Sequence, residues 1–169
     1  PVVCVGAGPS LDKNAHLLYE FPGVIIATDK AYKMLKVRGI APDVVISIDC
    51  HYDLVPEFLD CPGNNDNILV LNTCADPKVT KIWGGQIFWF IMRHPGVQFT
   101  DRILPALFPT FGSIENCGNV GNASVLLADH MGLSPIILIG QDYGYTGGKL
   151  SARRFEYSDG GKISEIELD

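Results

Sequence analysis

The stretch from Gly118 to Tyr145, GNVGNASVLLADHMGLSPIILIGQDYGY, constrains the fold of this chain more than any other stretch. It predicts a helix that opens on glycine and asparagine, followed by an apolar strand that ends on polar and aromatic residues. The first N–H groups of a helix lack partners and attract anions, and open α/β sheets bind ligands at the carboxyl ends of their strands. One helix–strand unit of this kind therefore supplies two parts of a binding site.

Short apolar runs alternate with helical segments along the chain, which is typical of a parallel sheet covered on both faces. Runs rich in Val and Ile predict strands at Pro1–Val5, Val24–Ala27, Asp43–Asp49, Ile68–Leu71, Ile87–Met92 and Ile136–Ile139. Helices are expected at Leu11–Phe21, before Gly39, and at Leu54–Leu59, Pro77–Ile82 and Val120–Met131. The prolines of Arg93–Cys117 predict a long excursion over the site. The tail, Arg154–Leu168, alternates apolar and polar residues around Asp159-Gly160-Gly161, which indicates a hairpin.

These patterns predict an α/β fold: a Rossmann-like, doubly wound, mostly parallel sheet with a C-terminal β-hairpin. The length of 169 residues fits one domain, so residues 1–169 are expected to form a single Rossmann-like nucleotide-binding domain. Hydrophobic residues make up 47% and charged residues 19%, which excludes a disordered chain. Because Pro1 already lies in a predicted strand, we expect the chain to be a fragment of a longer protein.

Composition also limits the partners and the compartment. The net charge of -6 and the lack of a basic block argue against nucleic acid as a partner. No apolar run approaches the roughly 20 residues that span a membrane, and no signal peptide is recognisable. The five cysteines are scattered without C-x-x-C spacing, as in proteins of a reducing compartment. We therefore expect a cytoplasmic protein whose partner is a small-molecule nucleotide donor.

A glycine-rich turn joins the first predicted strand to the first predicted helix. It begins like a dinucleotide fingerprint, but Leu11 occupies the position where that motif needs a small residue. The turn is instead expected to bring its backbone close to a phosphate, with the Ser10 hydroxyl as an added donor. The residues concerned are Gly6, Gly8, Pro9 and Ser10. A turn and helix cap without a ligand is the alternative.

Aspartates follow three of the predicted strands. Asp29 stands where a Rossmann acid holds a ribose hydroxyl, with a helix N-cap as an equally weighted alternative. Asp49 and Asp142 are expected at one carboxyl edge, where they hold Mg²⁺ against substrate phosphates or act as a general base. Loop capping is their alternative. His51, two residues past Asp49, is a candidate catalytic acid or base.

Glycine and asparagine, which have low helix propensity, stand at the start of the helix predicted at residue 120, and their presence there needs a reason. Without Cβ atoms, glycine lets a ligand lie against the backbone, while asparagine offers neutral donors; turn chemistry alone is the alternative. The residues are Gly118, Asn119, Gly121 and Asn122, and Gln141 is expected to face them from the strand end. Lys149 follows two glycines, but Leu150 excludes a P-loop. Lys149 is still expected to reach a phosphate from its loop.

Taken together, three motifs resemble one family. They are Gly6-Ala-Gly-Pro-Ser-Leu11, Pro42-Asp43 leading through a strand to Asp49, and Gly118-Asn-Val-Gly leading to Ile139-Gly-Gln-Asp142. Their order and spacing are similar to those of the archaeal 6-hydroxymethylpterin diphosphokinase-like (MptE-like) proteins and the bacterial Maf motility accessory factors, which are proposed glycosyltransferases of flagellin. A more distant likeness links the chain to bacterial sialyltransferases.

The resemblance implies a nucleotide-dependent transferase. In a Maf-like glycosyltransferase, the two glycine-rich turns would hold a CMP-type nucleotide sugar while Asp142 or Asp49 takes a proton from the acceptor. In a diphosphokinase, these aspartates would hold Mg²⁺ on ATP while a pterin alcohol attacks. A nucleotide-binding module without catalysis is the third possibility. Maf-like sequences tend to carry a His-Ala pair where this chain has Ser151-Ala152, which leaves one polar side chain of that pattern missing.

Overall fold

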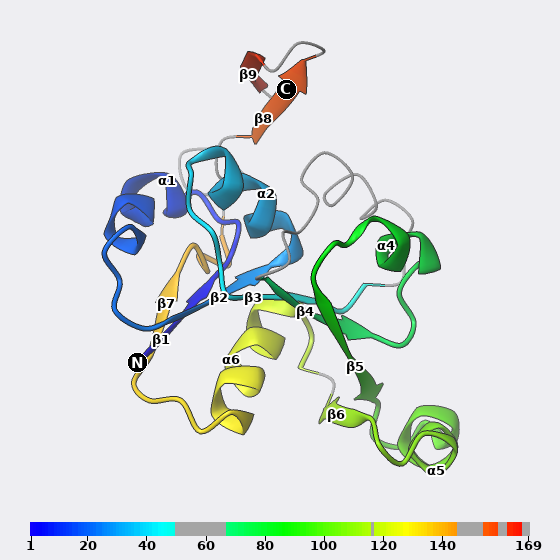
Figure 1. The fold of residues 1–169 in the computed structure, drawn as a ribbon. Coiled ribbons are helices and arrows are strands. Elements are labelled where there is room, and N and C mark those ends of the chain that lie inside the picture. The colour runs from blue at the N-terminus through cyan, green and yellow to red at the C-terminus, as the bar shows by residue number, and fades with distance from the viewer. Residues whose placement is uncertain (50–66, 116, 145–153, 159–161, 167–169) are drawn as a thin grey trace.

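A computed structural model describes residues 1–49, 67–115, 117–144, 154–158 and 162–166 of the chain (Figure 1). Its main sheet has seven strands, every neighbouring pair parallel, in the order β6-β5-β4-β3-β2-β1-β7. The strands are β1 Val2–Val5, β2 Val24–Thr28, β3 Val44–Ser47, β4 Ile68–Asn72, β5 Gln86–Arg93, β6 Gly112–Glu115 and β7 Ile136–Ile139. The predicted α/β, Rossmann-like architecture is confirmed.

Helices cover both faces of this sheet because its strands alternate their side chains between two apolar faces. On one face, Val3 and Val5 pack with Leu11 and Leu35. On the other, Cys4 packs with Ala123. Figure 1 shows α1 and α2 on the first side and α6 on the second. The helical segments are α1 Leu11–Asn14, the 3-10 helix η1 Ala15–Leu18, α2 Asp29–Val37, α4 Pro77–Ile82, the π-helix η3 Phe99–Ile103, α5 Leu104–Leu107 and α6 Val120–His130.

Successive strands are added to the sheet in one direction from β1 to β6, and β7 is then added on the other side of β1. From β1 the strands add one after another out to β6, and α6 then carries the chain back to pair β7 with the free side of β1. Val2 lies opposite Ile136 and Val5 opposite Ile139 in that pair. Ligands of doubly wound sheets bind at such a switch point, outside the carboxyl ends of the strands. The fold therefore points to the turns that follow β1 and β7.

Some elements differ from their predicted form. The helix predicted at Leu11–Phe21 is the short α1 followed by the 3-10 turn η1. The excursion at Arg93–Cys117 contains an additional parallel strand, β6, beside β5. Its sequence, GSIE, has a single β-branched residue, so its place in the sheet comes from pairing with β5 rather than from propensity.

Two further strands, β8 Arg154–Ser158 and β9 Lys162–Ile166, pair antiparallel in a separate small sheet. Arg154 lies opposite Ile166, and Ser158 lies opposite Lys162. The predicted turn at Asp159-Gly160-Gly161 and the predicted helix at Leu54–Leu59 lie outside the described residues. Within the described part of the chain, none of the helices has the length and apolar character needed to traverse a bilayer.

Candidate functional site at the carboxyl edge of the sheet

The turns after β1 and β7 are bonded directly to each other. Gly6 N–H donates to Ile139 O at 2.8 Å, and Gly8 N–H donates to Gly140 O at 2.7 Å. A Cβ atom on Gly6 would lie 2.5 Å from Gly140 O, and Gly140 itself has a φ of 69°. Both glycines are therefore required by the contact between the two turns. This contact is a structural reason for the glycines, independent of any ligand.

Asp142 closes the start of α1. Its Oδ2 accepts a hydrogen bond from Ser10 N–H at 2.8 Å, and a Cβ atom on Gly8 would collide with this carboxylate. The next two N–H groups also have partners, because Leu11 donates to Gly8 O and Asp12 donates to Pro9 O. Acceptors of the protein itself thus occupy the donors where a phosphate was expected to bind.

Asparagines organise the start of α6. Asn119 is its N-cap, and Oδ1 of that side chain accepts from Asn122 N–H at 2.8 Å. The Asn122 side chain bends back, so that its Nδ2 donates to Cys117 O at 2.8 Å. Gly118 precedes the cap with a φ of 86°, a left-handed conformation that glycine adopts without strain. Helix capping and turn geometry account for these residues, and their amide oxygens line the start of the helix.

Tyr143, which the sequence patterns did not single out, connects the start of α6 with the turn after β7. Its hydroxyl lies 2.9 Å from Asn122 Oδ1 and 3.0 Å from Gln141 Oε1. A Cβ atom on Gly121 would lie 2.9 Å from this hydroxyl, so glycine makes room for it. The φ of Tyr143 is 50°, which is rare for a bulky residue, and 66% of the residue is exposed. Such an outlier is a pointer to function.

Asp29 faces the protein interior at the end of β2. Its Oδ1 accepts from Lys30 N–H at 2.8 Å, its Oδ2 accepts from the Ser47 hydroxyl at 2.8 Å, and the residue is 1% exposed. Loss of solvation raises the pKa of Asp29 to about 6, and the negative charge of Asp49 adds to the rise. Asp29 is the first residue of α2, and Thr28 is the N-cap. A ribose contact at Asp29 stays a prediction, and it would require this buried carboxyl group to become exposed.

The other predicted site residues lie apart or outside the described chain. Asp49 and Asp142 follow β3 and β7, which are three strand spacings apart, or about 14 Å. The structure does not bring them together, so each would hold Mg²⁺ only with other ligands. The described residues contain no group of three or more His, Cys, Asp or Glu side chains arranged for a metal ion. His51 and Lys149 lie outside the described residues.

A buried amide at the end of β4 was also missed by the sequence patterns. Asn72 is 5% exposed and its Nδ2 donates to Ile48 O at 2.8 Å. Its Oδ1 is buried and, within the described chain, has no hydrogen-bond partner. Buried acceptors usually have one, often a water molecule. No sequence signal marks this atom, because its burial depends on neighbouring strands.

Comparison with known proteins decides the family. A family model described as "6-hydroxymethylpterin diphosphokinase MptE-like" matches residues 1–148. The chain belongs to the MptE-like family. The resemblance identified from its motifs is thereby confirmed. No curated protein matches the sequence significantly.

Among solved structures, this MptE-like chain is similar to the structure of a Maf glycosyltransferase from Magnetospirillum magneticum AMB-1. The match has a TM-score of 0.71 and 23% sequence identity, and it covers 99% of this chain and 27% of that one. The MptE-like chain thus spans about a quarter of the length of this relative. At this identity the likeness establishes the fold.

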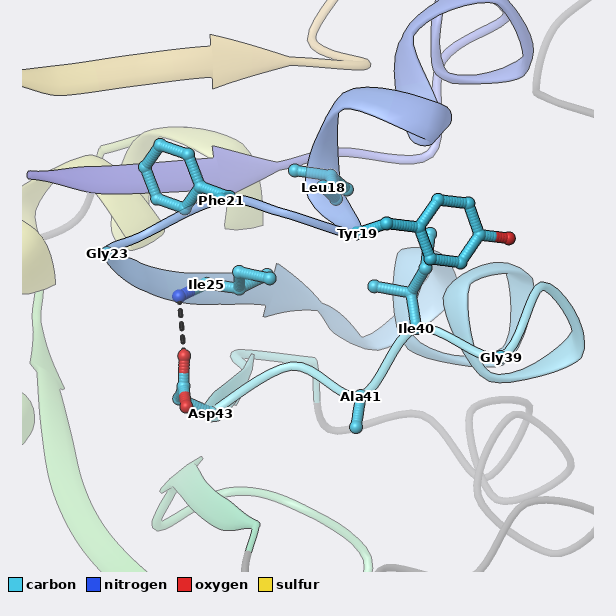
Figure 2. Close-up of a pocket in the computed structure, with 9 residues that line it drawn as sticks. All are labelled: Leu18, Tyr19, Phe21, Gly23, Ile25, Gly39, Ile40, Ala41 and Asp43. Carbon is cyan, nitrogen blue, oxygen red and sulfur yellow. Dashed lines mark hydrogen bonds between the residues drawn. The ribbon is translucent and has the colours of Figure 1, made fainter.

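A separate hollow of about 250 Å³ lies near the amino ends of β2 and β3 in the MptE-like chain (Figure 2). It is lined by residues that include Tyr19, Ile40 and Asp43. The Asp43 carboxylate accepts from Ile25 N–H at 2.8 Å, so it fixes the start of β2. The hollow is at the opposite end of the strands from the switch point and takes no part in the candidate site.

Proposed function

We propose that this MptE-like chain is the nucleotide-binding part of a transferase, a Maf-like glycosyltransferase that uses a CMP-type nucleotide sugar. The observation that carries the proposal is the convergence, at the β1/β7 switch point, of the two glycine turns with the start of α6. Switch points of this kind bind nucleotides in other doubly wound proteins. The similar structure, that of a Maf glycosyltransferase, supports the choice of reaction.

In this proposal the cofactor-binding residues are those of the two turns and of α6, and Asp142 is the candidate base. Since Asp142 Oδ2 is bonded to Ser10 N–H, proton transfer from an acceptor hydroxyl falls to Oδ1. The same bond fixes the carboxylate relative to both turns. A base that is held in place in this way needs little reorganisation during the reaction.

A diphosphokinase is the second candidate, and the description of the matching family model favours it. Mg²⁺ would then bind at Asp49 or at Asp142, each with ligands from ATP phosphates and water. A nucleotide-binding module without catalysis is the third candidate, and in it Asp142 serves only to cap α1.

Calorimetric titration with CMP, a CMP-sugar and ATP with Mg²⁺ separates these candidates. The glycosyltransferase proposal expects CMP and the CMP-sugar to bind without metal, and transfer to an acceptor to be lost in Asp142→Asn. Asp129→Asn, an exposed change on α6, is the control and should keep full activity. Binding of ATP with Mg²⁺, without binding of CMP or the CMP-sugar, would contradict the glycosyltransferase proposal and support the diphosphokinase. Binding of CMP-sugar with no turnover on any acceptor would support the inert module.

A further inference from the structure

Three side-chain amide oxygens gather around the Tyr143 hydroxyl at the switch point. Asn122 Oδ1 and Gln141 Oε1 both lie within 3.0 Å of the Tyr143 hydroxyl, and Asn119 Oδ1 lies 3.5 Å from it. These oxygens come from two elements, the start of α6 and the turn after β7. The group is called the oxygen cluster below.

Backbone carbonyls fix which way the two amides face. Asn122 Nδ2 donates to Cys117 O at 2.8 Å, and Gln141 Nε2 donates to Cys4 O at 3.3 Å. Turning either amide over would set a carbonyl oxygen against another carbonyl oxygen. The amide oxygens therefore face the Tyr143 hydroxyl and the open side of the site.

The oxygen cluster has more acceptors than hydrogens. The Tyr143 hydroxyl has a single hydrogen, so it can serve either Asn122 Oδ1 or Gln141 Oε1 at one time. Asn119 Oδ1 already accepts from Asn122 N–H. Among the described residues, one amide oxygen is thus left for a donor from outside, and the exposure of Tyr143 and Asn122 keeps the cluster open to solvent.

Two N–H groups at the start of α6 already have acceptors. Asn122 N–H donates to Asn119 Oδ1, and Ala123 N–H donates to Asn119 O. A phosphate at this position would face the partial negative charges of the oxygen cluster. Hydroxyl or amino groups carry the hydrogens that the surplus oxygen needs.

We propose that the oxygen cluster binds the uncharged, donor-bearing part of the nucleotide, its ribose hydroxyls or the amino group of its base, and excludes the phosphate. This inference rests on the proposed function, because it assigns one subsite of the same nucleotide. It differs from the expectation that the asparagines of Gly118–Asn122 act as neutral donors, because their oxygens are the groups that face the site.

Titration of the ¹⁵N-labelled chain, followed by NMR, tests the proposal without any substitution. Cytidine should shift the side-chain amide signals of Asn122 and Gln141, while inorganic phosphate leaves them and the Gly121 amide in place. A saturable shift of the Gly121 amide by phosphate, or no effect of cytidine, overturns the proposal. Comparison of cytidine with 2′-deoxycytidine and uridine then separates the ribose from the base. If CMP binds while cytidine leaves the cluster unmoved, this inference fails and the proposed function stands.

Asn119→Asp provides a second, independent test. Asp caps helices as well as Asn does, so the fold is kept, and the added charge lies beside the oxygen cluster. We expect cytidine to bind about two- to fivefold more tightly, because the second carboxylate oxygen adds a charged acceptor beside the surplus oxygen, and charged acceptors make stronger hydrogen bonds. Asn14→Asp makes the same change away from the site and controls for net charge. A tenfold or greater weakening of CMP alone in Asn119→Asp would place the phosphate at α6 and overturn the proposal.

Discussion

The carboxylate of Asp142 accepts a hydrogen bond from the backbone N–H of Ser10 at 2.8 Å, across 132 residues of sequence. The bond joins the turn after β7 to the first turn of α1. Gly8 lies between the two, where a side chain would collide with the carboxylate. One acidic side chain thus fixes the geometry of both strands' turns at the switch point.

Replacement of Asp142 by Ala should lower the free energy of unfolding by about 1 to 3 kcal/mol, because Ser10 N–H loses its charged acceptor. Asp142→Asn keeps an acceptor oxygen and should cost less than half as much. Urea denaturation measures both values. Asp129→Ala, an exposed change on α6, is the control and should stay within about 0.5 kcal/mol of the parent. A loss for Asp142→Ala no larger than that for Asp129→Ala would show that the bond to Ser10 contributes nothing.

Gly8→Ala should destabilise the fold by about 1 to 3 kcal/mol, since the new methyl group overlaps Asp142 and approaches Gly140 O at 2.7 Å. Gly112→Ala is the matched control, because a Cβ at Gly112 meets no atom within 4 Å. Thermal unfolding of the two variants tests the difference. A Gly8→Ala variant as stable as Gly112→Ala would mean that the two turns are not packed as described.

Asp29 should make the fold less stable as pH rises. Its folded-state pKa of about 6 is above the ordinary value of 3.8, so the folded state binds the proton more tightly than the unfolded state does. The contribution of Asp29 is fully present below about pH 4 and is lost as pH rises through 6. A shift of this size corresponds to about 3 kcal/mol.

Asp29→Asn removes this titration. The free energy of unfolding of the variant, relative to that of the parent, should therefore increase between pH 4 and pH 7 and should show no such increase at lower pH. Denaturation with urea at a series of pH values measures the difference. Asp129→Asn, whose side chain is exposed, should keep the slope of the parent. Parallel pH profiles for Asp29→Asn and the parent would contradict the burial of a titrating carboxyl group.

Leu138→Lys should reduce self-association of the chain with little loss of stability. Leu138 is 53% exposed on β7, an edge strand of the sheet with four aliphatic residues and no charge. Exposed apolar edge strands pair with other chains, and lysine on the edge prevents this. Sedimentation velocity at increasing concentration should show less association in Leu138→Lys than in the parent. An equal or greater tendency to associate would mean that β7 does not mediate it.

Sequence patterns predict the strands of the main sheet well where Val and Ile run together, as in Val44–Ser47 and Ile136–Ile139. Such runs leave a strand few alternatives, because a buried parallel strand is apolar on both faces. They failed at Gly112–Glu115, where pairing with β5 decides the structure. The first helix was predicted too long, since its apolar spacing does not distinguish an α-helix from α1 followed by a 3-10 turn.

For the candidate site, the sequence predicts the positions of the residues but not their contacts. The positions of Gly6–Ser10, Asp142 and Gly118–Asn122 at one carboxyl edge follow from the alternation of strands and helices and from turn chemistry, which are readable from local sequence. What those residues touch does not follow from either of them. Whether Asp142 caps α1 or lies beside Asp49 depends on which strands are neighbours in the sheet.

By itself the sequence determined the alternation of strands and helices, the family and the turns that gather at the switch point. Only the tertiary structure decided that Asp142 bonds to Ser10, that Asp29 is buried, and that Tyr143 meets the amide oxygens at the start of α6. The physical reason is range. Backbone preferences act over a few residues, whereas these hydrogen-bond partners and this burial involve segments from 18 to 132 residues apart that only the folded sheet brings together.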